Sequence, residues 1–491
     1  MNILLVYPEF LDALWGFKHA LKITKKKAYM PPLGLLTVAA MLPIQWTKRL
    51  VDLNVTKLTK EDLVWADYVF IGAIAVQRKS AQQIIESCRK AGVKVVAGGP
   101  LFIDEYEQFV GVDHFILNEA ELTLPCFLSE LERGCAKSVY KTSEFADVKK
   151  TPVPLWELAD IRHYTSVSIQ FSRGCPYQCE FCNVTTLFGH NPRIKTVVQV
   201  IAELNTLYDI GWRGTVFFVD DNFIGNKRYI KNELLPAIIA WKENKTGISF
   251  FTEASINLAD DEELMRLMVQ AGFDAVFVGI ETPDEISLDE CGKKQNKNRD
   301  LLEDVKRIQR SGLQVQGGFI VGFDNDAPSI FKRQIDFIQK SGIVMANVAI
   351  LQAPIGSKLY ERLKKEGRLL GQMGFNVVDS VTNFVPAMDP HILQEGYKEI
   401  MQYIYSPKHY YKRIKTLFLV YKPLKMDVAK NLRITLLLRS IYYLGIVGKE
   451  RFCFWKLLLW TCIRRPELMS LAIRLSICGH HYRKIVEINL R

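Results

Sequence analysis

The stretch that decides the fold is Phe171-Ser-Arg-Gly-Cys-Pro-Tyr-Gln-Cys-Glu-Phe-Cys-Asn183, which carries three cysteines in a C-x3-C-x2-C pattern. Cys175, Cys179 and Cys182 are close enough in the chain to lie on one short loop. Three thiolates can bind three irons of a cubane [4Fe-4S] cluster, whereas the usual cysteine site for such a cluster has four. The spacing therefore predicts a cluster with one iron left open for a substrate.

Two other uses of clustered cysteines agree less well with the sequence. A structural zinc site closes its tetrahedron with four ligands, and no second C-x2-C or H-x3-H pair is present. A disulfide framework is typical of small secreted domains, whereas these ten cysteines are scattered over 491 residues. We assign no role to the remaining seven, which are Cys88, Cys126, Cys135, Cys291, Cys453, Cys462 and Cys478.

The length of 491 residues exceeds what one hydrophobic core normally serves, which predicts two or three domains. Hydrophobic residues make up 48% of the chain, enough to form buried cores. The first residues lack a basic leader, and their apolar run is too short for a signal peptide. We therefore expect a cytoplasmic protein.

Residues 1–135 alternate short apolar runs with helical stretches, such as residues 79–90. This alternation predicts an α/β domain of the Rossmann-like type, with a parallel sheet covered by helices on both faces. The expected strands are residues 3–7, 50–52, 68–73, 93–97 and 114–117.

The carboxyl ends of these strands are where an open parallel sheet binds its ligands. Glycines at such an edge let a ligand approach the backbone closely, although Gly-Gly-Pro is also an ordinary turn signal. The residues found there are Pro8, Asp52, Ala73, Gln77, Gly98 and Gly99.

Residues 136–165 are predicted to be a linker, because Pro152 and Pro154 cannot occupy a helix interior or a central strand. From residue 166 to about residue 355, strand and helix alternate six times. This pattern predicts a partial TIM-type (βα)6 barrel within residues 166–370, with its chemistry at the carboxyl ends of the strands. The expected strands are residues 166–171, 215–219, 248–253, 275–279, 315–321 and 345–351, and the expected helices are residues 197–208, 227–242, 261–271, 299–311 and 329–340.

The cysteine loop and its flanking residues resemble the radical S-adenosylmethionine (SAM) enzymes, in which the open iron chelates the amino and carboxylate groups of SAM. The resemblance implies that Phe181 lies near the adenine of SAM. It also implies that Asp220 and Asp221, at the end of the second barrel strand, receive the methionyl ammonium group. A carboxylate in this position can instead cap the next helix, and Asp221 or Asp284 taken alone favours that interpretation.

Three later strands carry further matches to the same family. Glu253 corresponds to a position that contacts the ribose, and Glu281 ends the fourth strand. The segment from Gly318 to Gly322 resembles a G-x-I-x-G segment that packs against adenine. The ordered occurrence of these residues after the cysteine loop is what favours a catalytic barrel.

A Rossmann-like domain directly ahead of this motif looks like the cobalamin-binding domain of the class B radical SAM methyltransferases. The matching segments are Val95-Val-Ala-Gly-Gly-Pro100 and Asn118-Glu-Ala-Glu121. The D-x-H-x-x-G motif that supplies a histidine to cobalt in other cobalamin enzymes is absent, so we expect cobalamin without a histidine ligand. The resemblance implies that cobalamin is bound by Pro8, Asp52, Ala73, Gln77, Gly98, Gly99 and Glu119.

Residues 31–40, 218–226 and 279–284 further resemble the hopanoid C-2 methylases and their close relatives. The resemblance implies a C-methyltransferase that uses a [4Fe-4S] cluster, SAM and cobalamin to methylate an unactivated carbon of a lipophilic, hopanoid-like molecule. It also implies an electron donor such as flavodoxin or ferredoxin. Two alternatives stay open: a cyclisation or rearrangement without methyl transfer, and a non-catalytic cobalamin or iron-sulfur sensor.

The C-terminal region, residues 371–491, is predicted to be basic and mostly helical. Residues 401–491 contain nine Lys and nine Arg against one Asp and three Glu, a net charge of +14, while residues 1–400 carry −3. Cations interrupt every apolar run before the roughly 20 residues that a spanning helix needs. The helices can lie on an anionic membrane as a peripheral contact or cap the barrel with a solvated basic face. Nucleic-acid binding would suit the charge, but no recognition motif accompanies it.

Overall fold

The computed structural model describes residues 1–10, 14–371, 382–423 and 434–490. The chain forms two compact units. The first comprises Met1–Asp12, Lys26–Ile169 and Arg193–Trp212, and the second comprises Ala13–Lys25, Gln170–Pro192 and Arg213–Arg491.

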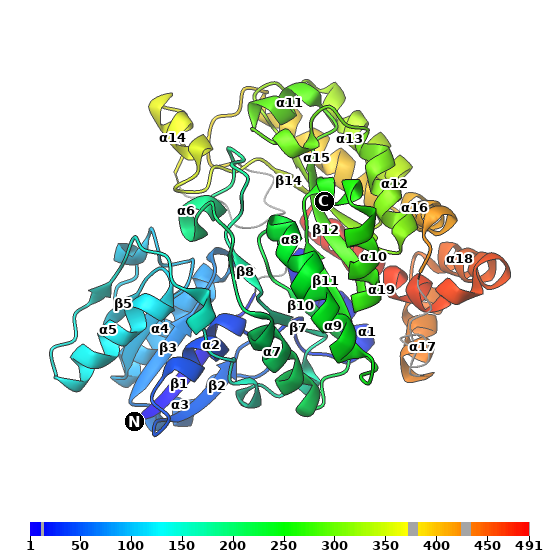
Figure 1. The fold of residues 1–491 in the computed structure, drawn as a ribbon. Coiled ribbons are helices and arrows are strands. Elements are labelled where there is room, and N and C mark those ends of the chain that lie inside the picture. Colours follow the sequence, from blue (N-terminus) through cyan, green and yellow to red (C-terminus); the bar gives the residue numbers. More distant parts are fainter. Residues whose placement is uncertain (11–13, 372–381, 424–433, 491) are drawn as a thin grey trace. The chain divides into compact units, whose positions relative to one another are not determined.

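The first unit is built on a six-stranded sheet in the order β2-β1-β3-β4-β5-β6, in which neighbouring strands are parallel (Figure 1). Successive side chains of β1 enter two different cores, since Leu4 packs with α3 and α4 whereas Ile3 packs with α2 and α5. Helices on both faces confirm the Rossmann-like architecture. The strands are β1 (Asn2–Tyr7), β2 (Thr47–Asp52), β3 (Tyr68–Gly72), β4 (Lys94–Gly98), β5 (His114–Ile116) and β6 (Val139–Tyr140), and the helices are α2 (Leu33–Met41), α3 (Lys60–Trp65), α4 (Arg78–Ala91) and α5 (Ala120–Glu132).

Four strands of this sheet match the sequence-based expectation to within one residue at each end, and two differ more. β2 begins at Thr47 rather than Leu50, because its first half is a polar and partly exposed edge segment without an apolar signal. β6 lies within residues 136–165, where only a linker was expected. Its two residues pair with β5 and are too few to leave a recognisable alternation.

The six expected barrel strands are all present. β7 (Ser166–Ile169) is the last element of the segment Lys26–Ile169 in the first unit. In the second unit, β10 to β14 pair in parallel in their sequence order. Helices connect these strands, which confirms the partial TIM-type α/β architecture. The strands are β10 (Thr215–Phe218), β11 (Ser249–Glu253), β12 (Phe273–Glu281), β13 (Gln314–Val321) and β14 (Ala346–Ile350), and the connecting helices are α7 (Val197–Asp209), α8 (Lys227–Tyr229), η8 (Ile230–Leu234), α9 (Leu235–Lys242), α10 (Glu262–Ala271), α11 (Glu285–Glu290), α12 (Leu301–Ser311) and α13 (Ser329–Ser341).

Local end signals fix several of these helices. Asp261 accepts a hydrogen bond from Leu264 N at 3.0 Å and caps α10, and Asp284 caps α11 through the N–H groups of Ile286 and Ser287. Gly272 ends α10 in the left-handed conformation, with φ of +102°. Asp284 is thus a helix cap.

The described residues of the C-terminal region, 382–423 and 434–490, are mostly helical, and part of them pack on the barrel. α15 (Pro390–Tyr405) and α16 (Pro407–Val420) lie against α13, and α19 (Met469–Asn489) lies against α15. Arg413 of α16 is fully buried and donates to Ile404 O at 2.8 Å and to Val344 O at 3.1 Å. These helices agree with the cap interpretation. None of the described helices is long and apolar enough to cross a bilayer.

We expect Gly396→Ala in α15 to destabilise the second unit. A Cβ at this position would lie 2.2 Å from the ring of Phe331, which is itself buried in α13. Overpacking of this kind costs about 1–3 kcal/mol. Urea denaturation should therefore show a lower free energy of unfolding.

The matched control is Gly34→Ala in α2, where a Cβ would have no neighbour within 4 Å. Because alanine loses less backbone entropy than glycine in a helix, this variant should be more stable by about 0.5–1 kcal/mol. Equal changes in the two variants would contradict the packing that we describe.

Candidate functional site

The cysteine loop follows β7 and is held by its own backbone. Gly174 has φ of +96°, and a Cβ there would lie 2.8 Å from Gly189 O, so only glycine is accommodated. Cys175 N donates to Gly189 O at 3.3 Å, and Cys182 N donates to Cys179 O at 3.1 Å. The loop is therefore folded into one turn-rich unit with its three thiols free and partly exposed.

The three thiols are near enough to influence one another. Burial raises the pKa of the Cys182 thiol to about 12, and the Cys179 and Cys175 charges add to the shift. In the described residues, no three His, Cys, Asp or Glu side chains converge on a single ion. In a [4Fe-4S] cluster, by contrast, each thiolate binds a different iron. The loop can hold a [4Fe-4S] cluster, whose positive charge would stabilise the thiolates.

Helix α14 (Lys358–Lys365) supports the loop. Arg362 forms ion pairs with Glu180 at 2.7 Å, between the second and third cysteines, and with Asp324 at 2.8 Å. Leu359 N donates to Glu180 O at 2.9 Å. Arg362 was not identified from the sequence, because it lies far along the chain and outside the strand ends.

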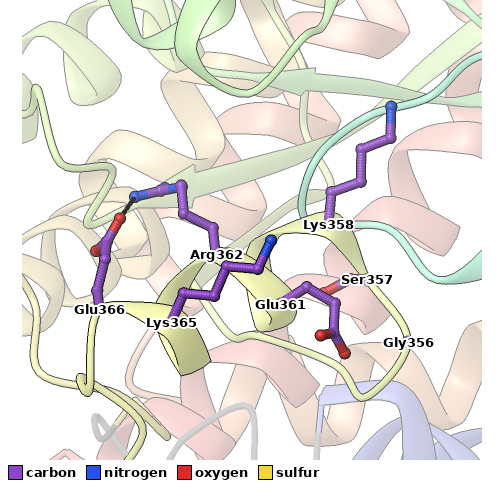
Figure 2. Close-up of a pocket in the computed structure, with 7 residues that line it drawn as sticks. All are labelled: Gly356, Ser357, Lys358, Glu361, Arg362, Lys365 and Glu366. Atoms are coloured by element: carbon purple, nitrogen blue, oxygen red, sulfur yellow. Dashed lines mark hydrogen bonds and ion pairs between the residues drawn. The ribbon is translucent and has the colours of Figure 1, made fainter.

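A cavity of about 500 Å³ lies next to this contact. Figure 2 shows the side chains that line it, among which Arg362 also pairs with Glu366. One short segment supplies every residue that lines it, and most of them are charged. We therefore regard it as the outer surface of the α14 support. The lining residues are Gly356, Ser357, Lys358, Glu361, Arg362, Lys365 and Glu366.

A second support comes from the segment after α11. Glu180 N donates to Cys291 O at 2.8 Å, and Gln295 Nε2 lies 3.9 Å from Cys179 Sγ, as a hydrogen-bond donor to the sulfur. Hydrogen bonds to cysteine sulfurs stabilise the reduced form of an iron-sulfur cluster. Gln295 is thus a residue of the site that the sequence motifs did not reveal.

Lys293 places a buried positive charge in the same region. Its ammonium lies 2.6 Å from Glu281, and its side chain is only 12% exposed. Burial lowers and the Glu281 charge raises the pKa of Lys293, and the net shift is upward. A Cβ on Gly279 would lie 2.8 Å from Lys293 Nζ and 2.3 Å from Glu281 Oε1, so the glycine leaves room for the ion pair. Glu281 itself adopts a left-handed φ of +62°.

Asp220 and Asp221 tie the loop to the end of β10. Asp220 is buried and accepts hydrogen bonds from Phe171 N at 3.3 Å and from Ser172 N. Asp221 accepts from Gly174 N at 2.9 Å. Burial raises the pKa of Asp220 to about 7. Both carboxylates thus position the backbone that leads into the cysteines.

Glu253, at the end of β11, differs from these two carboxylates. Within the described residues it accepts no hydrogen bond. Burial raises its pKa to about 8, the charges of Asp221 and Asp220 add to this, and Lys293 opposes it. Glu253 is half-buried, and a poorly solvated carboxylate without an internal partner is costly to ionise. It is therefore available to a ligand that offers donors.

The remaining barrel residues predicted from the family shape the apolar part of the site. Phe181 packs against Phe323, with ring centroids 6.3 Å apart. A Cβ on Gly318 would lie 3.0 Å from the Phe277 ring, and Gly322 has φ of +99°. Both glycines are thus needed for packing or backbone geometry, whether or not a ligand is present.

In the first unit, the polar residues predicted to bind cobalamin have internal partners. Asp52 accepts from the Tyr164 hydroxyl at 2.9 Å, and Gln77 Nε2 donates to Pro8 O at 2.6 Å. Glu119 forms a bidentate ion pair with Arg193, at 2.6 and 2.8 Å. These side chains therefore brace the carboxyl edge of the sheet through their internal hydrogen bonds.

The glycines of this edge are explained by close backbone packing. A Cβ on Gly98 would lie 2.7 Å from Ile116 O, and one on Gly99 would lie 2.8 Å from Ala73 O. His114 begins β5, at the opposite end of the strand, and its Nδ1 is 2.7 Å from Lys137 O. His114 therefore lies away from the carboxyl edge at which cobalamin is expected to bind.

Two family models match the chain. The Radical SAM superfamily covers residues 169–338, and a domain of unknown function, DUF4070, covers residues 357–491. Among solved structures, the cobalamin-dependent S-adenosylmethionine radical enzyme OxsB covers 99% of this chain and 83% of its own, with 15% identity and a TM-score of 0.65. The radical S-adenosylmethionine methyltransferase TsrM from Kitasatospora setae covers 76% of this chain and 78% of its own, with 17% identity and a TM-score of 0.58. These two structures share the fold.

Two curated proteins are similar over nearly the whole chain. An uncharacterized methyltransferase from Synechocystis sp. is 39% identical and covers 99% of this chain and 92% of its own. The hopanoid C-2 methylase of Rhodopseudomonas palustris is 35% identical and covers 98% and 92%. The protein is therefore an enzyme, and it belongs to the class B, or cobalamin-dependent, radical SAM methyltransferase family, in the subgroup that includes the hopanoid C-2 methylases.

Proposed function

We propose that this enzyme methylates an unactivated carbon of a lipophilic small molecule of the hopanoid-like terpenoid class. The observation that carries the proposal is the pairing of a three-thiol loop with Glu253, a half-buried carboxylate that accepts no hydrogen bond from the described residues. Such a site has the ligands for a cluster with one open iron and a group to receive a co-substrate. The similarity to the hopanoid C-2 methylase supports the substrate class.

The barrel residues divide into holders of the cluster and holders of SAM. Cys175, Cys179 and Cys182 would bind the [4Fe-4S] cluster. When bound, the cluster supplies the electron that divides SAM into methionine and a 5′-deoxyadenosyl radical, which takes a hydrogen atom from the substrate. Glu253 would accept hydrogen bonds from the ribose hydroxyls, since it has no other donor. Phe181, Gly318 and Gly322 would provide the apolar surface for adenine.

The remaining acidic residues have less freedom to bind SAM. Asp220 is engaged by the backbone of the loop, so we propose a positioning role for it. Asp221 accepts one hydrogen bond from Gly174 N, and Glu281 is paired with Lys293. Because a carboxylate can accept several hydrogen bonds, Asp221 or Glu281 would still be able to receive the methionyl ammonium group.

Cobalamin would bind at the carboxyl edge of the sheet in the first unit, beside Pro8, Ala73, Gly98 and Gly99. When bound, methylcobalamin supplies the methyl group. The side chains of Asp52, Gln77 and Glu119 keep the edge rigid through their internal hydrogen bonds. A rigid edge loses little conformational freedom when a large cofactor binds.

The enzyme also needs partners. One electron per cleavage requires a reductant, for which a flavodoxin or ferredoxin is suited. A substrate of this class resides in lipid, so we propose that the basic C-terminal helices bring the enzyme to the inner face of a membrane as a peripheral protein. The charge of +14 in residues 401–491 supports this contact.

A cyclisation or rearrangement without methyl transfer is the second candidate. The anaerobic magnesium-protoporphyrin IX monomethyl ester cyclase of Rubrivivax gelatinosus is 22% identical over 54% of this chain. This similarity is partial, whereas the two methyltransferase relatives match nearly the full length.

Product analysis tests the proposed reaction. The protein is reconstituted anaerobically with iron, sulfide and cobalamin, reduced, and supplied with SAM and hopanoid-containing lipid extract. We expect 5′-deoxyadenosine and S-adenosylhomocysteine to form together, with a substrate mass gain of about 14 units for the added CH₂. Deoxyadenosine without S-adenosylhomocysteine would favour rearrangement. Neither product, with an intact cluster, would contradict an enzymatic role. Cys179→Ala is the control that should abolish both products.

The buried charges predict opposite changes in the cluster potential. Lys293→Met removes a positive charge, so the reduced cluster should be less stable and the midpoint potential lower by about 60 mV or more, a tenfold change for one electron. Glu281→Gln removes a negative charge and should raise it. Redox titration followed by electron paramagnetic resonance measures both. The exposed neighbour Lys294, changed to Met, is the matched control, and shifts of the same sign in the Lys293 and Glu281 variants would contradict this electrostatic account.

Glu253 predicts a pH dependence of stability in the cofactor-free protein. Because its folded pKa is raised to about 8, the folded state keeps a proton that the unfolded state releases, and this stabilisation is lost as pH rises toward 8. Glu253→Gln should therefore lose less stability than the wild type between about pH 5 and pH 8. Urea denaturation at several pH values measures this. Asp220 acts in the same direction, so some dependence will remain. The exposed Glu233→Gln should behave like wild type.

A further inference from the structure

The helix α18 (Arg451–Arg464) is apolar on two opposite faces. Its inner face packs into the second unit through Phe454, Leu457, Leu458 and Thr461, which are all buried. Its outer face is also apolar and is strongly exposed to solvent. The outer residues recur at helical spacing and are Phe452 (69% exposed), Trp455 (46%), Leu459 (65%) and Ile463 (70%).

The preceding helix η12 (Ile441–Ile446) extends this outer face. Trp455 Nε1 donates to Gly445 O at 3.0 Å and so fixes the end of η12 against α18. Ile446 and Val447 follow directly and are 59% and 60% exposed. We call these two residues and the four outer residues of α18 the α18 surface. A water-facing helix normally carries polar residues there, so this arrangement indicates a binding surface.

The charged residues of η12 and α18 themselves are all cations. Arg451, Lys456 and Arg464 are exposed, and in the described part of the chain none of them has a carboxylate within ion-pair distance. The Arg451 guanidinium lies 5.0 Å from the Phe452 ring. The one acidic residue of the segment 434–464 is Glu450, which is buried and paired with His480 and Arg483. An apolar stripe is therefore bordered by unneutralised cations.

We propose that the α18 surface docks on an anionic lipid bilayer, with α18 lying parallel to the membrane plane at the headgroup level. Apolar side chains would enter the acyl boundary while Arg451, Lys456 and Arg464 contact lipid phosphates. A helix of 14 residues is about 21 Å long, too short to cross the hydrocarbon core. The inference rests on the proposed function for its choice of a lipid partner, but it names the contacting surface.

Two other occupants fit the α18 surface less well. An acidic reductant would pair with the three cations but would leave the apolar stripe in water. A second copy of the chain, related by a two-fold axis, would bury the stripe but bring like charges together. An anionic bilayer has negative headgroups above an apolar layer, so it can contact the cations and bury the apolar stripe at the same time.

The test is sedimentation of the reconstituted full-length enzyme with phosphatidylcholine vesicles, with and without about one quarter phosphatidylglycerol. We expect binding to the anionic vesicles that is at least about tenfold weaker without the anionic lipid, and weaker when salt is raised from about 0.1 M to about 0.5 M. The variant Phe452→Ser/Leu459→Ser/Ile463→Ser should bind at least about tenfold less. Lys456→Glu/Arg464→Glu should also lose binding, most strongly at low salt.

The matched control is Val64→Ser/Val110→Ser/Val198→Ser, which removes three exposed apolar side chains of the first unit. It should bind vesicles like the wild type. SAM cleavage, measured as deoxyadenosine, shows that each variant is folded and active. Loss of binding in the α18 variants with SAM cleavage retained would support the proposal.

Three results would overturn the proposal: no binding of the wild type to either vesicle, equal binding by the α18 variants, or a soluble dimer that the α18 variants dissociate. The result is separable from the proposed function. Methyl transfer to a detergent-dispersed substrate without vesicle binding would contradict only the proposed docking on a membrane. Vesicle binding without methyl transfer would contradict only the proposed reaction.

Discussion

The burial of negative charge around the cysteine loop is the constraint on which the rest of the site depends. Three thiols and the carboxyl groups of Asp220, Asp221, Glu253 and Glu281 occupy one region of the second unit, and Lys293 is the buried cation that opposes them. Charges of one sign cannot all be ionised in a poorly solvated place. Without cofactors, protons therefore remain on Cys182 and Glu253, whose pKa values are raised.

This constraint separates the strand-end residues by what they hold. Asp220 and Asp221 accept hydrogen bonds from backbone N–H groups of the loop, and Glu281 forms an ion pair with Lys293. Such bonds fix the loop before any cofactor binds, which lowers the cost of ordering it. Glu253 is left with no internal donor. The free carboxylate is therefore where a ligand gains most from binding.

The sequence predicted the two parallel sheets and the cysteine loop because each has a strong local signal. Alternating apolar runs define β1 and β10 to β14, and glycine spacing defines the edge at Gly98. Gln295 and Arg362 carry no such signal, because their partners Cys179 and Glu180 are distant along the chain. Lys293 lies 12 residues from its partner Glu281, a spacing that follows no helix or strand period. The sequence also could not show that Asp52, Gln77 and Glu119 have internal partners. A polar residue at a strand end looks the same whether it binds a ligand or braces the edge.

In the basic C-terminal region, too, composition alone does not distinguish buried cations from exposed ones. Arg413 and Lys456 are both cations in helices that also carry large apolar residues, yet Arg413 is fully buried and donates to two carbonyl groups, whereas Lys456 is exposed. The two cations differ in whether they lie on the face of the helix that packs against the rest of the unit. α16 meets the barrel helix α13 with the face that carries Arg413, whereas α18 meets the second unit with Phe454 and Leu457 and turns Lys456 outward. α18 has a second apolar face that does not pack on the unit, which is the face proposed above to dock on a membrane. The cap and the proposed membrane contact are therefore compatible, since they would involve different helices of one region.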